Sequence, residues 1–157
     1  MGHQSPRHAL RHVRDGHHVR QGRARVPLAR AVRDSRLIEQ KVLFREEQIA
    51  AYARASGDMN PIHLDAKFAQ SVGLPGLIAH GMLQMSMAAI VAAKAAGGAK
   101  RLRKLSVRFA GMVEPGDTVT FTADEVAEGK LQIKAVNQHG DVIISKGAAE
   151  FVTGRGA

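Results

Sequence analysis

From about residue 100 onward, apolar and polar residues alternate along the chain. Successive side chains of a strand point to opposite faces, so a period of two predicts strands with one buried face. The first strand would place Leu105, Val107 and Phe109 inward, and further strands are expected around 119–123, 131–135 and 142–152. Turn-forming sequences lie at 114–117, 128–129 and 139–141. The second half of the chain is therefore predicted to be an antiparallel meander.

The segment before these strands begins with a short strand and then changes to a helical period. The strand is expected over residues 37–44, and apolar residues at helical spacing predict helices over 45–55 and 66–72. Asp65 stands where an N-cap belongs, and Gly73 is a suitable end for the second helix.

Residues 81–96 form the longest apolar stretch, interrupted by only three polar side chains, Gln84, Ser86 and Lys94. A helix that is apolar on nearly every side must be surrounded by the rest of the fold. A membrane span needs about twenty predominantly apolar residues, and this alanine-rich stretch is shorter and contains a lysine, so we expect no span. The pattern predicts an α+β domain whose antiparallel sheet wraps its longest helix.

Charge divides the chain into two parts, although 157 residues are typical of one domain. Residues 1–36 contain nine Arg, no Lys and two Asp, a formal charge of +7. Residues 37–157 contain fourteen basic and twelve acidic residues, which leaves +2. The folded part is nearly balanced, so we expect no specific nucleic-acid partner. The absence of cysteine excludes disulfides and thiolate metal sites and fits a cytoplasmic location.

The basic segment 1–36 has few large apolar residues and is expected to be a disordered N-terminal extension, with the domain over 37–157. A non-specific phosphate-binding tail is one alternative interpretation. A mitochondrial transit peptide is another, which the arginines permit and the two serines support poorly. Whether this segment belongs to the mature protein stays open.

The most informative motif is residues 57–65, which places Asp58 and His63 five residues apart. Asn60-Pro61 keeps this segment out of a helix, so a carboxylate and an imidazole would share one loop. Such a pair is a candidate site of proton transfer. The alternative is that both residues only form the turn, since Gly-Asp-x-Asn-Pro is favourable loop chemistry in any protein.

A second motif, His80-Gly81, opens the long apolar helix. The first turn of a helix has unpaired backbone N–H groups, and glycine allows a ligand to approach them closely. His80 itself is expected to be a structural histidine with satisfied hydrogen bonds. Ser86 either bonds back to the carbonyl four residues earlier or reaches the acid/base pair.

Three motifs together resemble the MaoC-like, (R)-specific enoyl-thioester hydratases. They are Tyr52-Ala-x-Ala-Ser-Gly-Asp-x-Asn-Pro-x-His63, Gly73-Leu-Pro-x-x-Ile-Ala-His-Gly-Met82 and Phe109-x-x-x-Val-x-Pro-Gly-Asp117. The resemblance spans about residues 37–152, and its first two motifs are specific together. It implies a hot-dog fold, in which the sheet wraps the central helix, and a dimer whose acyl tunnel draws on both subunits.

Residue by residue, the family's catalytic aspartate and histidine match Asp58 and His63, and both are present. Gly81 matches the glycine whose backbone N–H binds the thioester oxygen. Asn60 matches the position that helps hold the loop, and Ser86 falls on a serine that the family often has in the central helix. The resemblance implies hydration of an acyl-CoA or acyl-carrier-protein thioester without a metal or other cofactor.

Two other functions stay open at this point. The chain could be a non-catalytic hot-dog subunit in a heterodimer, although its acid/base pair is intact. It could also be an acyl-CoA thioesterase, because one fold hosts many reactions. The sequence does not define the acyl chain length, the thioester carrier or the physiological direction.

Overall fold

The computed structural model describes residues 37–154, so the expected disorder of segment 1–36 lies outside the described residues. The strands are β1 (Ile38–Leu43), β2 (Leu102–Phe109), β3 (Thr118–Ala127), β4 (Lys130–Val136) and β5 (Val142–Phe151). The helices are α1 (Glu46–Ser56), α2 (Ala66–Ser71) and α3 (Gly81–Ala96), with short 3₁₀ turns η1 (Pro61–His63) and η2 (Ala99–Arg101). The bounds agree with the sequence-based expectations to within one or two residues, except that β2, β3 and β4 are longer than the segments first identified.

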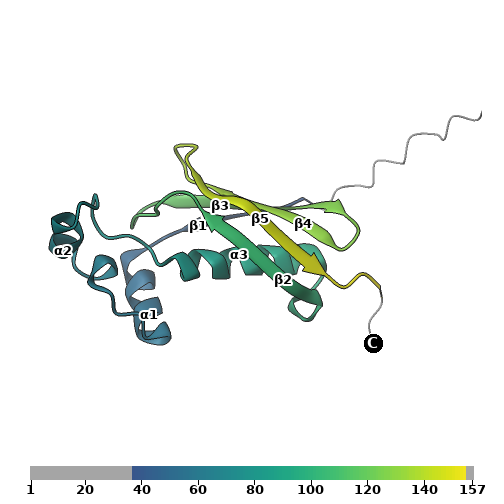
Figure 1. Cartoon of the computed structure of the whole chain (residues 1–157), viewed down its shortest axis with the longest axis horizontal. Coiled ribbons are helices and arrows are strands. Elements are labelled where there is room, and N and C mark those ends of the chain that lie inside the picture. Colours follow the sequence, from purple (N-terminus) through teal and green to yellow (C-terminus); the bar gives the residue numbers. More distant parts are fainter. Residues whose placement is uncertain (1–36, 155–157) are drawn as a thin grey trace, which may run out of the picture. The chain divides into compact units, whose positions relative to one another are not determined.

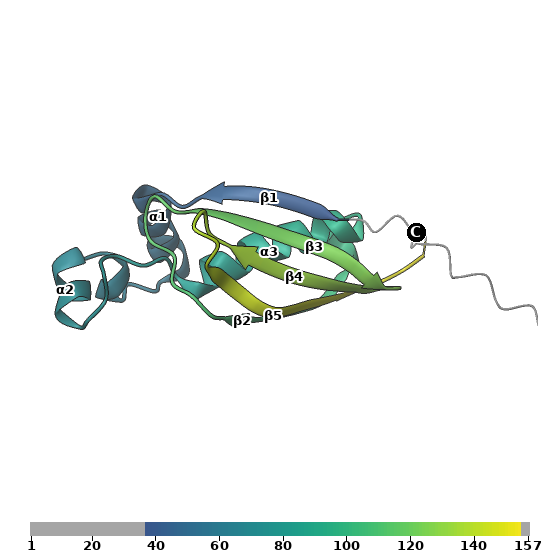
Figure 2. The ribbon, with the colours of Figure 1, turned by 90° about the horizontal axis from the view of Figure 1, so that it is seen from above.

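The five strands form one antiparallel sheet in the order β1-β3-β4-β5-β2, and α3 lies along one face of it (Figure 1). Viewed from above, β1 borders the sheet on one side and β2 lies beside β5 on the other (Figure 2). The architecture is the predicted α+β fold with a sheet packed on a central helix.

The predicted meander holds only for β3, β4 and β5, because β2 pairs with β5 rather than with β3. The connection 110–117 is too long for a tight hairpin and crosses the sheet from edge strand β2 to β3, the neighbour of the other edge strand, β1. On the way, Val113 accepts a hydrogen bond from the N–H of Ala79 (2.7 Å), and Asp117 accepts one from Phe44 (2.8 Å). Alternation along a strand does not specify its partner.

The hydrophobic core lies between α3 and the face of the sheet that covers it. Its largest fully buried side chains include Phe44, Ile49, Val91, Phe121, Leu131, Ile133, Ile143 and Ile144. Burying a side chain of this size contributes roughly 1.5–3 kcal/mol relative to leaving it exposed.

Burial of α3 on all sides, as expected from its sequence, is not reached within a single chain. Met82 is 58% exposed and Ile90 is 43% exposed, because the sheet covers only one side of the helix. Phe109, expected on the inner face of its strand, is also 43% exposed. Exposed large apolar side chains near one another indicate a surface that another molecule covers.

Local signals placed the helix ends correctly. The carboxylate of Asp65 accepts a hydrogen bond from the N–H of Phe68 (3.1 Å) and caps α2. Gly97 ends α3 in the left-handed conformation, with φ of 81°. Within residues 37–154, no helix has the length and apolar character needed to cross a membrane.

Candidate active site

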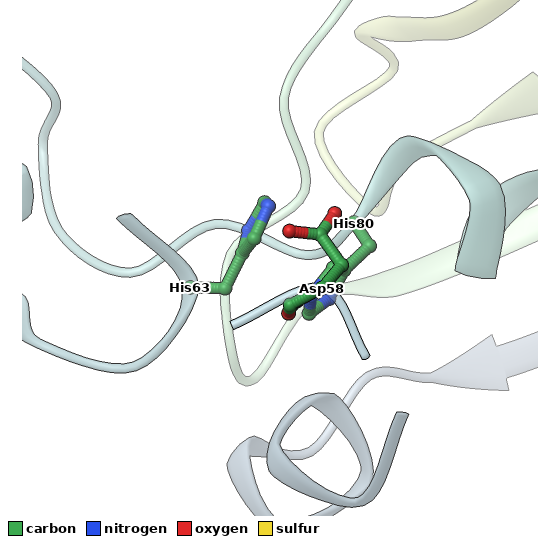
Figure 3. Close-up of side chains that lie close together, drawn as sticks. All are labelled: Asp58, His63 and His80. Carbon is green, nitrogen blue, oxygen red and sulfur yellow. Dashed lines mark hydrogen bonds between the residues drawn. The ribbon is translucent and has the colours of Figure 1, made fainter. Parts of the chain in front are cut away.

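Three side chains from separate segments meet at the N-terminal end of α3: Asp58, His63 and His80 (Figure 3). Asp58 belongs to the loop after α1, His63 ends η1, and His80 immediately precedes α3. One nitrogen or oxygen of each lies within 4.8 Å of the others. Figure 3 shows the Asp58 carboxylate directed at the ring of His63.

The loop that carries Asp58 is built from short-range hydrogen bonds. Gly57 ends α1 with φ of 78°, and the N–H of Asp58 donates to Ser56 Oγ (3.2 Å). Asp58 Oδ1 accepts from the N–H of Asn60 (3.3 Å), and Asn60 Oδ1 accepts from the N–H of Ile62 (3.2 Å). Asp58 thus does help to form the turn, as the alternative interpretation expected, while Asn60 caps η1 and so supports the turn that carries His63.

His63 is only 8% exposed, and its Nδ1 lies 2.7 Å from the main-chain oxygen of Ile78. A carbonyl oxygen can only accept, so Nδ1–H must be the donor. In the neutral ring this leaves Nε2 with a free lone pair, which can accept a proton or a hydrogen bond. The main chain therefore selects the tautomer that a general base needs.

His80 is 2% exposed and contacts both other members of the cluster. Its Nε2–H donates to the main-chain oxygen of Asp58 (3.0 Å), and its ring stacks on that of His63, with centroids 3.7 Å apart. The Tyr52 ring is also close, at 5.0 Å between centroids. His80 Nδ1 is buried without a hydrogen-bond partner within the described residues. The sequence-based expectation of satisfied hydrogen bonds therefore holds for Nε2 of His80 but not for Nδ1.

Gly81 is the first residue of α3, and Phe109 packs directly against it. The first N–H groups of a helix have no acceptor within the helix, so the Gly81 N–H is free to bind a ligand oxygen. A Cβ at this position would lie 3.2 Å from the Phe109 ring. Because glycine has no side chain, residue 81 leaves room both for the Phe109 ring and for a ligand that approaches the backbone N–H.

Ser86 does not contact the cluster by hydrogen bonding. Its Oγ donates to the main-chain oxygen of Leu83 (2.7 Å), so it bonds back to the helix as one interpretation of the sequence expected, but to the carbonyl three residues earlier rather than four. Sequence analysis gave no role to Gln84, which is 3% exposed and donates weakly to Ala79 O (3.4 Å). Its position as a polar residue in an otherwise apolar helix was the sequence signal that could have marked Gln84 as a buried polar side chain close to the site.

The spacing of the cluster suits a small bridging species. A water oxygen about 2.8 Å from each of two acceptors can span up to about 5.6 Å between them. Asp58, His63 and His80 also form the one group of possible metal ligands that residues 37–154 contain. Carboxylate and imidazole are ordinary zinc ligands, and a zinc ion would need these atoms at about 2.0–2.2 Å from it.

Comparison with known proteins assigns the chain to a family. The MaoC like domain model matches residues 27–148, and the chain belongs to this family, as the motifs indicated. The chain is 34% identical over 118 residues to 3-hydroxyacyl-thioester dehydratase Y of Mycobacterium tuberculosis, covering 70% of this chain and 40% of that protein. It is 41% identical over 90 residues to the fatty acid synthase beta subunit TOXC of Cochliobolus carbonum, covering 53% of this chain. The chain spans only 4% of TOXC.

The fold of this chain matches that of a solved hydratase over nearly the whole length of the hydratase. The (R)-hydratase from A. caviae involved in PHA biosynthesis superimposes with a TM-score of 0.66 at 26% identity, covering 77% of this chain and 96% of that one. The sheet packed on a central helix is therefore the hot-dog fold of these hydratases, as the sequence motifs implied.

Proposed function

We propose that this chain catalyses the reversible hydration of trans-2-enoyl thioesters to (3R)-hydroxyacyl thioesters. The observation that carries the proposal is the pairing of the Asp58 carboxylate with a His63 ring whose Nδ1–H is held by Ile78 O. A carboxylate oxygen of Asp58 and a nitrogen of the His63 ring lie within 4.8 Å of each other, a separation that one water molecule can bridge. Membership of the MaoC like family supports the same reaction.

In hydration, the water donates one hydrogen to Asp58 and the other to His63 Nε2. Its oxygen attacks C3 of the enoyl thioester while the pair takes up one of its protons. The second hydrogen stays on the oxygen as the new hydroxyl group, and the proton held by the pair passes to C2. Dehydration uses the same groups in reverse, because each step is reversible.

Attack at C3 moves an electron pair toward the thioester carbonyl, so negative charge develops on its oxygen. The N–H of Gly81, at the positive end of the α3 dipole, is the donor for this oxygen. A preorganised donor of this kind lowers a barrier by about 3 kcal/mol in acyl-transfer enzymes. This chain's residues would supply the chemistry without a metal or redox cofactor.

The active unit is a homodimer in this proposal. Exposed apolar side chains include Met82 and Ile90 on α3, Phe109 at the end of edge strand β2, where it packs against Gly81, and Met112 in the loop that follows β2. A second copy would bury these side chains, pair the free edge of β2 and complete the acyl tunnel. A related hot-dog subunit could take the same place in a heterodimer, and the thioester carrier is CoA or an acyl carrier protein.

An assay of the purified protein with crotonyl-CoA and longer trans-2-enoyl-CoAs tests the reaction. We expect loss of the absorbance of the conjugated double bond, no release of free thiol, and a (3R)-hydroxyacyl product by chiral analysis. Thiol release with the double bond retained would instead identify a thioesterase. If the intact dimer catalyses neither hydration nor thioester hydrolysis, the result would favour a non-catalytic subunit.

A further inference from the structure

We propose that His80 is a positioning residue of this site, which sets the geometry of Asp58 and His63 relative to each other. The inference rests on the proposed hydration and adds a third residue with a defined role. Two contacts of the His80 ring support this inference, one to the main chain of Asp58 and one to the ring of His63. It differs from the expectation that His80 only fills its place in the fold.

The first contact ties the Asp58 loop to the start of the central helix. His80 Nε2–H donates to the main-chain oxygen of Asp58 at 3.0 Å, and the two residues are 22 positions apart in the sequence. The other hydrogen bonds of Asp58 and Asn60 within the described residues are local and join residues at most three positions apart. His80 thus supplies the long-range anchor that the exposed loop otherwise lacks.

The second contact fixes the plane of the proposed base. The rings of His63 and His80 stack with centroids 3.7 Å apart and an interplanar angle of 27°. The hydrogen bond from His63 Nδ1–H to Ile78 O holds one edge of the ring. Stacking against the buried His80 ring restrains the plane of the His63 ring, which lies beside the Asp58 carboxylate (Figure 3).

His80 itself has no nitrogen available for the reaction. Its Nε2 hydrogen is engaged with the main chain, and its Nδ1 is buried without a partner within the described residues. The ring must therefore be the Nε2–H tautomer, with Nδ1 as a buried acceptor. These features assign His80 to holding the other two groups rather than to transferring protons.

Two substitutions separate the two contacts. His80→Phe keeps a flat ring for stacking but removes the N–H donor, while His80→Gln keeps a side-chain N–H but removes the ring. We expect each to lower kcat by about 10- to 100-fold with KM changed less than threefold, since a small displacement of reacting groups costs about that much. His139→Phe, at the exposed turn between β4 and β5, is the matched control and should keep the wild-type kcat.

A double-mutant cycle distinguishes positioning from a general loss of structure. If His80 acts through Asp58, then His80→Phe should slow the Asp58→Asn enzyme by less than threefold, because the group it positions is already disabled. An equal fold-loss in both backgrounds would overturn the proposal. So would a His80→Phe enzyme that retains kcat within twofold of wild type.

A spectroscopic measurement tests the inference apart from activity. In ¹⁵N-labelled protein at neutral pH, long-range ¹H–¹⁵N correlations should show His80 with Nε2 protonated and Nδ1 bare, and His63 with Nδ1 protonated. His80→Phe should shift the backbone amides around Asp58 while those of β4 stay in place. If the wild-type protein hydrates no enoyl thioester, the proposed function fails, but these tautomers and shifts still decide whether His80 holds the loop. A His80 ring protonated at Nδ1 instead would refute the inference.

Discussion

The aromatic ring of Phe109 lies against the α-carbon of Gly81, so close that a Cβ at residue 81 would be 3.2 Å from the ring. Phe109 is 43% exposed and can move by a few tenths of an ångström without disturbing the core. The packing therefore affects the surroundings of the Gly81 N–H more than the stability of the fold.

We expect Gly81→Ala to lower kcat/KM by at least tenfold while leaving the melting temperature nearly unchanged. The added methyl group crowds the approach to the proposed oxyanion donor, but alanine in a helix is favoured by up to about 1 kcal/mol, which offsets the crowding. Gly76→Ala is the matched control, because a Cβ there would meet only a side-chain oxygen at 4.0 Å. Wild-type kcat/KM in Gly81→Ala would remove Gly81 from the proposed site.

Asp58→Asn and His63→Ala should each lower hydration turnover by about two to four orders of magnitude, the usual effect of a positioned acid or base. Stopped assays with the enoyl thioester measure this, and circular dichroism checks the fold. Asp65→Asn is the control carboxylate: it caps α2, and asparagine caps a helix equally well, so turnover and stability should persist. Near-wild-type turnover in either site variant would mean that the residue only forms the turn.

Much of this site could be anticipated because its parts are local in sequence. The turn from Gly57 to His63 is held by side chains bonding to amides two residues away, and such turns are encoded by the residues themselves. The cap at Asp65 and the end of α3 at Gly97 follow from equally local chemistry.

The remaining features depend on tertiary contacts that periodicity does not report. The bond from His80 to Asp58 joins residues 22 positions apart, and the pairing of β2 with β5 depends on a connection that crosses the sheet. Phe109 matches the period of an inward position, but it ends its strand and lies at the exposed surface beside Gly81. Alternation identifies a strand and its two faces, and which face is covered at an edge depends on the neighbouring molecule.

The exposed apolar side of α3 leads to a prediction about assembly. Ile90→Glu should convert the proposed homodimer to monomer in size-exclusion chromatography with light scattering, because a buried unpaired carboxylate is costly at an interface. Val126→Glu is the control, because Val126 on β3 is also exposed but lies outside the proposed interface, and this variant should leave the proposed dimer intact. A dimer that survives Ile90→Glu would show that the two copies meet through another surface.

Deletion of residues 1–36 should leave hydration activity and the melting temperature nearly unchanged. The segment brings a formal charge of +7 but few large apolar residues that could join a core. Activity, thermal unfolding and dimer content of the truncated protein measure the effect. Loss of soluble, active dimer would show that the segment contributes to the folded domain.

Stereochemistry tests the proposed water position directly. A single water held between Asp58 and His63 lies on one side of the alkene, so its oxygen and the returned proton should add to the same face. Hydration of crotonyl-CoA in deuterium oxide should therefore place hydroxyl and deuterium in a syn relation. The similarity to (R)-specific hydratases predicts the (3R) configuration of this product. The coupling between the protons on C2 and C3, measured by NMR, reports the relative configuration, and chiral chromatography reports the absolute one. Anti addition would contradict the assigned geometry even in an active enzyme, because proton and hydroxyl would then have to come from different groups on opposite faces of the substrate, and a (3S) product would mean that water attacks the other face of C3.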